Sequence, residues 1–200
     1  MTAMNYSRYL HIKELLSLQN PITPPEHQDV HDSERLFIVV HQASETLLSQ
    51  ALVDLRHIAA DECDDRRCFT YRAERATRLV EALEANLELL RQTLKPEDFH
   101  QFRDRFGTAS GLQSAQFHEL FRLTERLTHG DGGPQVMVEL RLVRLQAAVR
   151  RWRVTHLKLV QYMIGNQQGS ADTSGVRYLA RQLNGIARCP VTGASASATA

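Results

Sequence analysis

Residues 33–45 read SERLFIVVHQASE, and this stretch indicates both the fold and the place to look for a site. It has no Pro or Gly and no strand-like alternation, so it predicts a helix. His41 stands at the end of the most apolar run in the chain, one helical turn after Phe37. Since residues four apart share a helix face, we expect the Phe37 ring and the His41 imidazole to line the same wall.

The composition argues against several classes of partner. The chain has 200 residues, enough for one domain with a real core, and its 24 Lys and Arg nearly balance 23 Asp and Glu. The basic surface that binds nucleic-acid phosphates is missing. The longest apolar runs fall short of the roughly 20 residues of a membrane span, and the first residues lack a secretory signal pattern. We therefore expect a cytoplasmic protein with no nucleic-acid or membrane partner.

Apolar residues recur at steps of three and four along most of the chain, which predicts an all-α fold. No alternation long enough for a strand is present in the sequence. A single domain is expected over residues 1–185, followed by a flexible tail of small residues, 186–200. The expected helices span residues 6–18, 33–61, 71–94, 96–106, 115–127, 135–164 and 176–183.

Two residues in these helices are open to two interpretations each. Arg103 follows Phe99 by one turn, so it either snorkels past aromatic rings, the interpretation favoured by the sequence alone, or clamps a carboxylate. His156 lies on the inward stripe of the longest helix, one turn after Trp152. It is either a core histidine or a ligand.

The cysteines show no zinc-binding pattern in the sequence. Cys63 and Cys68 are separated by four residues, not the two of most zinc knuckles, and no second pair follows. We interpret them as free surface thiols, and His27 and His31 as solvated loop residues. Cys189 precedes a proline, as in some haem-regulatory thiolates, but its place in the tail favours no role.

Two inward histidines on long helices, each one turn after an aromatic residue, are what a bundle needs to enclose a flat cofactor such as haem. Five segments in order, spanning about 170 residues, resemble tryptophan 2,3-dioxygenase and its relatives among the haem-dependent aromatic oxygenases. The resemblance implies a helical bundle around a b-type haem, in a shortened member of the family. The segments read YSRYLHIKELLSLQNP, HDSERLFIVVHQASE, FRDRFGTASGLQSAQF, RWRVTHLKLVQYMIG and GSADTSGVRYL.

The resemblance implies roles around the haem. His156 would be the proximal ligand of the haem iron, with Trp152 beside it. Ser110 and Gly111 would also border the cofactor. His41 would be the catalytic histidine above the bound oxygen.

The resemblance also implies a substrate site for a tryptophan-like amino acid. Phe37 and Phe99 would lie against the indole ring. Arg103 would pair with the substrate's carboxylate, which reverses the preference for snorkelling. Ser170 takes the place of a family threonine that binds the ammonium or carboxylate group.

The N-terminal arm, residues 1–31, is expected to reach a neighbouring subunit. Considered alone, Tyr6 and Tyr9 are explained equally well by packing and by binding. The resemblance implies that they and Leu10 line a partner's pocket in a homotetramer or dimer.

The implied reaction uses O2 to oxidise the indole ring at C2 and C3. Two departures from the family favour slightly a tailoring monooxygenase that leaves a 2-oxindole or hydroxylated product, over a dioxygenase that forms N-formylkynurenine. The loop Ser170–Gly175 is altered, and the loop His129–Pro134 replaces a long insertion. Phe99, where the family usually has a tyrosine, is a further departure. A haem-binding sensor without turnover is a further alternative.

Overall fold

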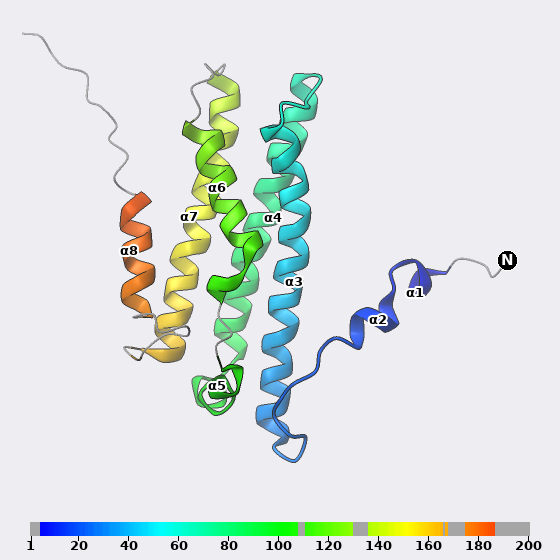
Figure 1. Ribbon diagram of the computed structural model, residues 1–200, viewed down its shortest axis with the longest axis vertical. Coiled ribbons are helices and arrows are strands. Elements are labelled where there is room, and N and C mark those ends of the chain that lie inside the picture. Colours follow the sequence, from blue (N-terminus) through cyan, green and yellow to red (C-terminus); the bar gives the residue numbers. More distant parts are fainter. Residues whose placement is uncertain (1–4, 108–110, 130–135, 166, 168–174, 187–200) are drawn as a thin grey trace, which may run out of the picture.

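The computed structural model describes residues 5–107, 111–129, 136–165, 167 and 175–186, and all regular structure within them is helical. The expected all-α fold is therefore confirmed. Four helices run side by side along the long axis of the molecule (Figure 1). They are α3 (Gln28–Ala59), α4 (Arg66–Thr93), α6 (Ala115–His129) and α7 (Val136–Ile164).

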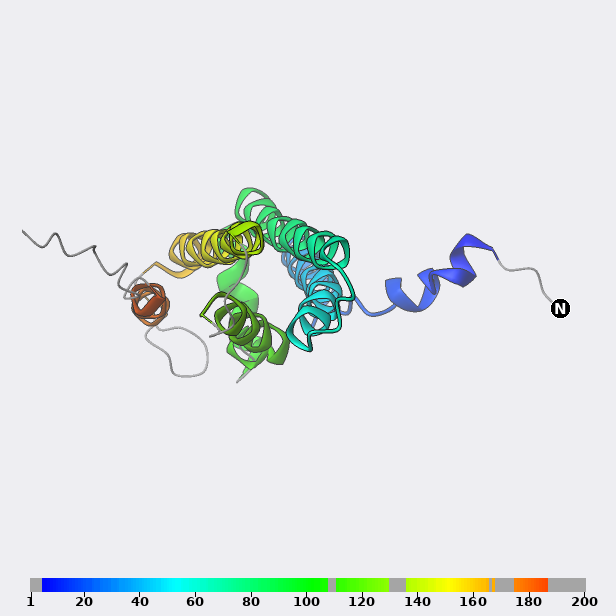
Figure 2. The ribbon, with the colours of Figure 1, turned by 90° about the horizontal axis from the view of Figure 1, so that it is seen from above.

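Seen down the bundle, these four helices form a ring (Figure 2). Helix α4 packs against α3 and α7, and α6 packs against the same two helices from the other side. Within the described residues, α3 and α7 make no direct contact with each other. They are therefore held at opposite corners of the ring by their shared neighbours.

Shorter elements close the bundle. Helix α5 (Pro96–Arg103) lies near one end and contacts α3 and α7, and a 3₁₀ turn, η1 (Asp104–Phe106), follows it. A second 3₁₀ turn, η2 (Gly111–Gln113), precedes α6. Helix α8 (Val176–Ile186) lies beside α7 (Figure 1).

The core consists of aliphatic side chains at steps of three and four on the facing helices. Burying each large side chain of this kind contributes about 1.5–3 kcal/mol, so the inward stripes hold the bundle together. Fully buried members include Leu48, Leu52 and Leu55 of α3, Val80 and Leu83 of α4, Leu120 of α6 and Leu145 of α7.

Helix α3 begins at Gln28, earlier than expected, because a buried carboxylate fixes the chain before it. Glu34 is 1% exposed and accepts hydrogen bonds from the backbone N–H groups of Ile22 at 2.9 Å and Thr23 at 2.8 Å. Burial alone raises the pKa of Glu34, but these hydrogen bonds and the charge of Arg105 lower it below its ordinary value. His31 was wrongly expected in a solvated loop: it lies in α3, partly buried, with Nδ1 2.7 Å from the Thr23 carbonyl oxygen.

Two other expected helices differ from the structure for local reasons. The helix expected over residues 6–18 is split into α1 (Tyr6–Tyr9) and α2 (Ile12–Leu16), because His11 adopts a left-handed conformation with φ 49°. Helix α4 begins five residues before Tyr71. The Asp65 side chain caps it by accepting from the Cys68 backbone N–H at 2.7 Å.

The arm that carries α1 and α2 stands away from the bundle (Figures 1 and 2). These two helices contact each other and no other helix of the described chain. Tyr6 is 75% exposed and Tyr9 70%. The arm therefore presents an apolar surface that its own bundle does not cover.

Among the described helices, α3 is long and apolar enough, by length and composition alone, to cross a membrane. No helix of this kind is expected from the sequence. The core helix of a soluble protein meets the same criterion, and α3 packs against α4, α5 and α6. The finding therefore carries no argument for a membrane.

A buried carboxylate on α3 binds two arginines of α4, and its removal tests how much this contact stabilises the fold. Asp54 is 0% exposed and accepts hydrogen bonds from Arg72 at 3.0 Å and from Arg75 Nε at 2.7 Å. We expect Asp54→Ala to lower the free energy of unfolding by about 2–4 kcal/mol, because two partly buried guanidinium groups lose their carboxylate. Denaturant titration measures the change.

The control for Asp54→Ala is Arg78→Ala. Arg78 pairs with Glu81 at 3.0 Å, but its side chain is 83% exposed. Exposed pairs contribute little, so this variant is expected to change the free energy of unfolding by about 0.5 kcal/mol or less. Equal losses in the two variants would contradict a special role for Asp54.

Candidate functional site

His41 and Phe37 lie against each other on α3, as the sequence predicts. Their ring centroids are 4.0 Å apart. Nδ1 of His41 is 2.8 Å from the Phe37 carbonyl oxygen. Because a carbonyl oxygen only accepts, Nδ1 carries the proton in this hydrogen bond. Nε2 of neutral His41 is then left as an acceptor that points away from its own helix backbone.

Phe37 is also the centre of an aromatic cluster built from α3, α5 and η1. Its ring centroid lies 5.8 Å from that of Phe99, 5.7 Å from Phe102 and 5.3 Å from Phe106. Phe102 is fully buried. Offset and edge-to-face ring pairs at these separations are favourable, so the cluster fixes the wall beside His41.

His156 lies on α7 against a second aromatic cluster. Its ring stacks on Trp152 with centroids 5.2 Å apart and planes inclined by 15°. Trp152 in turn stacks on Phe117 at 4.4 Å and lies 6.0 Å from Phe121. Within the described residues, the ring nitrogens of His156 have no hydrogen-bond partner. The residue is only partly buried, so these nitrogens are accessible to solvent or to a ligand.

Both imidazoles are neutral at neutral pH. Burial, and secondarily the charge of His41, lower the pKa of His156 to about 4. Burial also lowers the pKa of His41, although its bond to the Phe37 carbonyl and the charge of Glu45 oppose the shift. His41 keeps exposed surface, yet enough protein surrounds it for desolvation to dominate.

His41 and His156 are near enough to each other for the charge of His41 to lower the pKa of His156. They come from α3 and α7, the opposite corners of the ring, which do not pack against each other. One aromatic cluster adjoins His41 and the other adjoins His156. A neutral imidazole with a free nitrogen, set between apolar walls, can bind a metal ion or a flat metal-containing cofactor.

Arg103 ends α5, at the edge of the first cluster. Its guanidinium carbon is 5.9 Å from the centroid of Phe99, and Nη1 is 3.3 Å from Oε1 of Gln167. Gln167 immediately precedes the segment 168–174. Arg103 thus contacts both an aromatic ring and the residue that precedes the segment expected to bind the substrate.

The remaining predicted site residues are not brought together with the histidines. Ser110 and Ser170 lie outside the described residues. Gly111, at the start of η2, is exposed and has open space where a Cβ would stand, so nothing there requires glycine. Tyr6, Tyr9 and Leu10 lie on the separate arm.

Sequence reasoning named Phe37, Phe99 and Trp152 but overlooked four other rings of the two clusters. Phe102 and Phe106 follow Phe99 by three and seven residues, a helical spacing that could have revealed them. Phe117 and Phe121 are likewise four apart, on α6. Their contact with α7 could not be read from spacing, because it depends on how the two helices pack.

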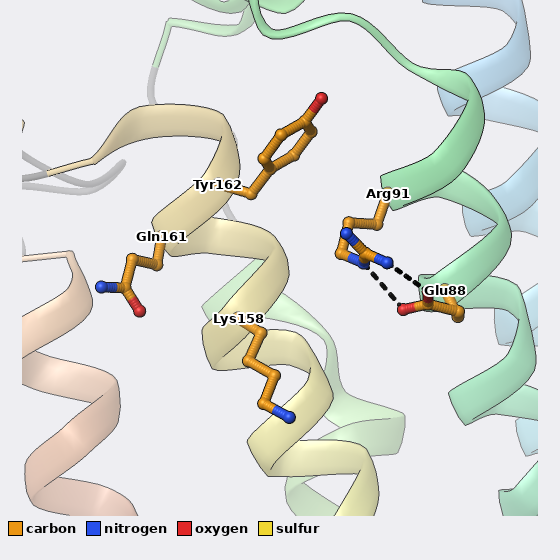
Figure 3. A pocket seen from close by; sticks show the side chains of 5 residues that line it. All are labelled: Glu88, Arg91, Lys158, Gln161 and Tyr162. Carbon is orange, nitrogen blue, oxygen red and sulfur yellow. Dashed lines mark hydrogen bonds and ion pairs between the residues drawn. The ribbon is translucent and has the colours of Figure 1, made fainter.

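A surface hollow of about 550 Å³ lies between α4 and α7 (Figure 3). It is lined by Glu88, Arg91, Lys158, Gln161 and Tyr162. Lys158 follows His156 by two residues, which places it on the opposite face of α7. Hydrogen bonds from Arg91 and Gln92, with the charge of Lys158, lower the pKa of Glu88 to about 2. This hollow is therefore a solvated ion-pair surface, separate from the histidine pair.

Comparison with known proteins points to one family. A family model described as tryptophan 2,3-dioxygenase matches residues 1–129. The chain is 27% identical to the tryptophan 2,3-dioxygenase of Kineococcus radiotolerans over 252 positions, covering 90% of this chain and 86% of the relative. It is 28% identical to that of Herpetosiphon aurantiacus over 249 positions, covering 89% and 92%. Identity reaches 38% with that of Caulobacter vibrioides, over 58% of this chain and 42% of the relative.

The longer alignments extend over more positions than this chain can fill. The match to the Kineococcus protein has 252 positions but uses 90% of a 200-residue chain. The remaining positions are residues of the relative without a counterpart here, inside the aligned region. This agrees with the expectation that the chain is a shortened version of its relatives.

Proposed function

The chain belongs to the tryptophan 2,3-dioxygenase family, and we propose that it uses haem and O2 to oxidise the indole ring of L-tryptophan or a close analogue. Membership makes it a haem-dependent oxidoreductase of that type. The observation that carries the proposal is the pair of neutral histidines contributed by α3 and α7, each beside an aromatic cluster.

The residues present fit a b-type haem. His156 has a neutral ring and no hydrogen-bond partner among the described residues, so a nitrogen is available for iron. Trp152 stacks on it and fixes its orientation. When bound, ferrous haem would supply O2 binding and activation. We assign His156 as the protein's iron ligand and Trp152 as a wall of the cofactor pocket.

His41 and Phe37 would hold the indole. With Nδ1–H committed to the Phe37 carbonyl, His41 presents Nε2 as an acceptor for the indole N–H. The Phe37 ring, supported by Phe99, Phe102 and Phe106, offers an apolar surface to the indole face. These contacts orient the indole ring and exclude water. Such positioning is what the protein contributes when a cofactor performs the oxidation.

Arg103 and Ser170 would hold the amino-acid end of the substrate. A guanidinium matches a carboxylate with two parallel hydrogen bonds. In the structure Arg103 reaches Gln167, at the edge of the segment that contains Ser170. A substrate carboxylate at Arg103 would therefore lie beside that segment. Ser110 and Gly111 remain proposed neighbours of the haem on the family resemblance alone.

We further propose that residues 1–185 form one cytoplasmic domain that assembles into a homo-oligomer, a tetramer or dimer. Tyr6, Tyr9 and Leu10 support this proposal because they are exposed on the arm. Helices α1 and α2 are not covered by the bundle of their own chain. A second subunit would bury them. The arm then contributes to a neighbour's substrate pocket.

Insertion of both oxygen atoms is the leading reaction. It converts tryptophan and O2 to N-formylkynurenine with no added reductant. The relatives compared above are named tryptophan 2,3-dioxygenases, and they lend no support to the sequence-based preference for a tailoring monooxygenase. Monooxygenation stays a second candidate because this chain lacks residues that those relatives have inside the aligned region.

The product mass distinguishes the two reactions. We expect haem-loaded, reduced protein given tryptophan and isotopically labelled O2 to form a product that carries two labelled atoms, with or without ascorbate. A product with one labelled atom that requires ascorbate would identify a monooxygenase. No product from either tryptophan or β-methyltryptophan would favour a haem-binding protein without turnover.

The assignment of His156 predicts a chemical rescue. His156→Gly is expected to lose the haem absorption of the wild-type protein, because the iron loses its protein ligand. Added imidazole should restore it by entering the space left by the side chain. Visible spectra of the reduced protein measure both effects.

His27→Gly is the matched control for this rescue, because His27 is exposed at the start of α3. It should keep the wild-type spectrum and show no response to imidazole. A wild-type spectrum in His156→Gly without imidazole would refute the ligand assignment.

Arg103→Ala should raise the KM for tryptophan by about 10- to 150-fold, because a charge-assisted pair contributes about 1.5–3 kcal/mol. Arg103→Lys keeps the positive charge but lacks the planar guanidinium group, so its KM for tryptophan should lie between those of the wild type and Arg103→Ala. Steady-state kinetics with tryptamine, which lacks the carboxylate, supply the internal control: the wild type and Arg103→Ala should then be nearly equal. A similar loss with tryptamine would show that Arg103 acts on the fold.

A further inference from the structure

The turn between α3 and α4 gathers three side chains that the proposed oxygenase site does not use. It lies at the end of the bundle away from α5 (Figure 1). His57 comes from the last turn of α3, Cys63 from the connection and Cys68 from the first turn of α4. Potential ligand atoms of all three lie within 4.8 Å of one another. Both cysteines are free thiols and partly buried.

The spacing of these atoms matches a tetrahedral metal site. Cys68 Sγ is 3.4 Å from His57 Nε2. With zinc–sulfur bonds of about 2.3 Å and zinc–nitrogen bonds of about 2.0–2.1 Å, tetrahedral ligands stand about 3.5–3.8 Å from one another. Small movements of the side chains would therefore bring all three onto one ion. Thiolate and imidazole are the donors that zinc prefers.

The second nitrogen of His57 is already oriented as in a metal site. Nδ1 lies 3.1 Å from Oε2 of Glu62, on the side of the ring away from Cys68. Histidines that bind metals usually donate their other N–H to a carboxylate, which fixes the ring and the tautomer. Glu62 thus leaves Nε2 as the free donor atom facing the thiols.

The surroundings provide charge balance and access. Arg72 interacts with Cys68 and with Asp54, which places a positive charge beside the cluster. Two thiolates would neutralise a divalent ion. An open hollow of about 380 Å³ adjoins the cluster, lined partly by His57, Glu62 and Arg72. It offers an entry path and room for water as a fourth ligand.

We propose that His57, Cys63 and Cys68 bind a zinc ion that fastens the turn between α3 and α4. Binding releases the two thiol protons to solvent and forms two zinc–sulfur bonds and one zinc–nitrogen bond, with no change in oxidation state. The site holds the ends of two core helices together, and it is independent of the oxygenase reaction. The spacing of the cysteines alone does not predict this zinc site, because the third ligand, His57, comes from the preceding helix.

Zinc added to the full-length, haem-loaded protein under reducing conditions tests the proposal. After removal of loosely bound metal, elemental analysis should find about one zinc per chain in addition to iron. Cadmium substituted for zinc should give an NMR shift typical of two thiolate ligands. Cys63→Ser and Cys68→Ser should each weaken zinc binding by at least about tenfold, whereas Cys189→Ser, which removes the third cysteine of the chain, should not.

Zinc content that is unchanged in the double variant Cys63→Ser/Cys68→Ser would overturn the proposal. So would a Cys63–Cys68 disulfide that persists under these conditions, because the ligands would then be consumed. Circular dichroism and the haem spectrum report whether each variant folds. If a cysteine variant does not fold, Glu62→Gln supplies the test, since it changes only the partner of His57 Nδ1. It should weaken zinc binding about tenfold, and unchanged affinity would count against the site.

Discussion

The separation of α3 from α7 is the constraint on which the rest of the structure depends. Each helix carries one histidine beside an aromatic ring, and direct packing of the two helices would leave no room for the proposed cofactor between them. Helices α4 and α6 prevent that packing, because each contacts both α3 and α7 and fixes their spacing. The buried Asp54 and its two arginines strengthen one of these contacts. The core therefore serves the site chiefly by keeping two helices apart.

Much of this arrangement could be predicted from the sequence, because helical periodicity is a local property. The stripe that includes Leu48, Leu52 and Leu55 predicts α3, and the four-residue step from Phe37 to His41 predicts their contact. The end points of the helices were harder to predict. Glu34 extends α3 by accepting backbone hydrogen bonds from a segment twelve residues earlier, and no periodicity records such a contact.

Relations between helices could not be predicted from spacing at all. The stacking of Phe117 on Trp152 joins α6 to α7, and the approach of His57 to Cys68 joins α3 to α4. Each depends on which faces meet in the folded bundle. The same is true of the low pKa of His156, which arises from burial and from a histidine on another helix. The helix pattern suggested that His41 and His156 act together, and the family resemblance added the roles proposed for each.

Helix α3 connects three features: the N-terminal arm, the proposed substrate site at His41 and the turn between α3 and α4. Gln42, next to His41, donates to the Leu18 carbonyl at 3.0 Å and accepts from Gln19 at 2.7 Å. The arm is thus fastened to α3 at the level of His41 and leaves the bundle from there. A partner subunit that covered the exposed arm would bear on α3 beside the proposed substrate wall. The proposed zinc ligand His57 lies sixteen residues further along α3, about 24 Å away. The proposed assembly and the proposed substrate site are therefore close enough to influence each other, whereas the thiol cluster is placed to act on stability alone.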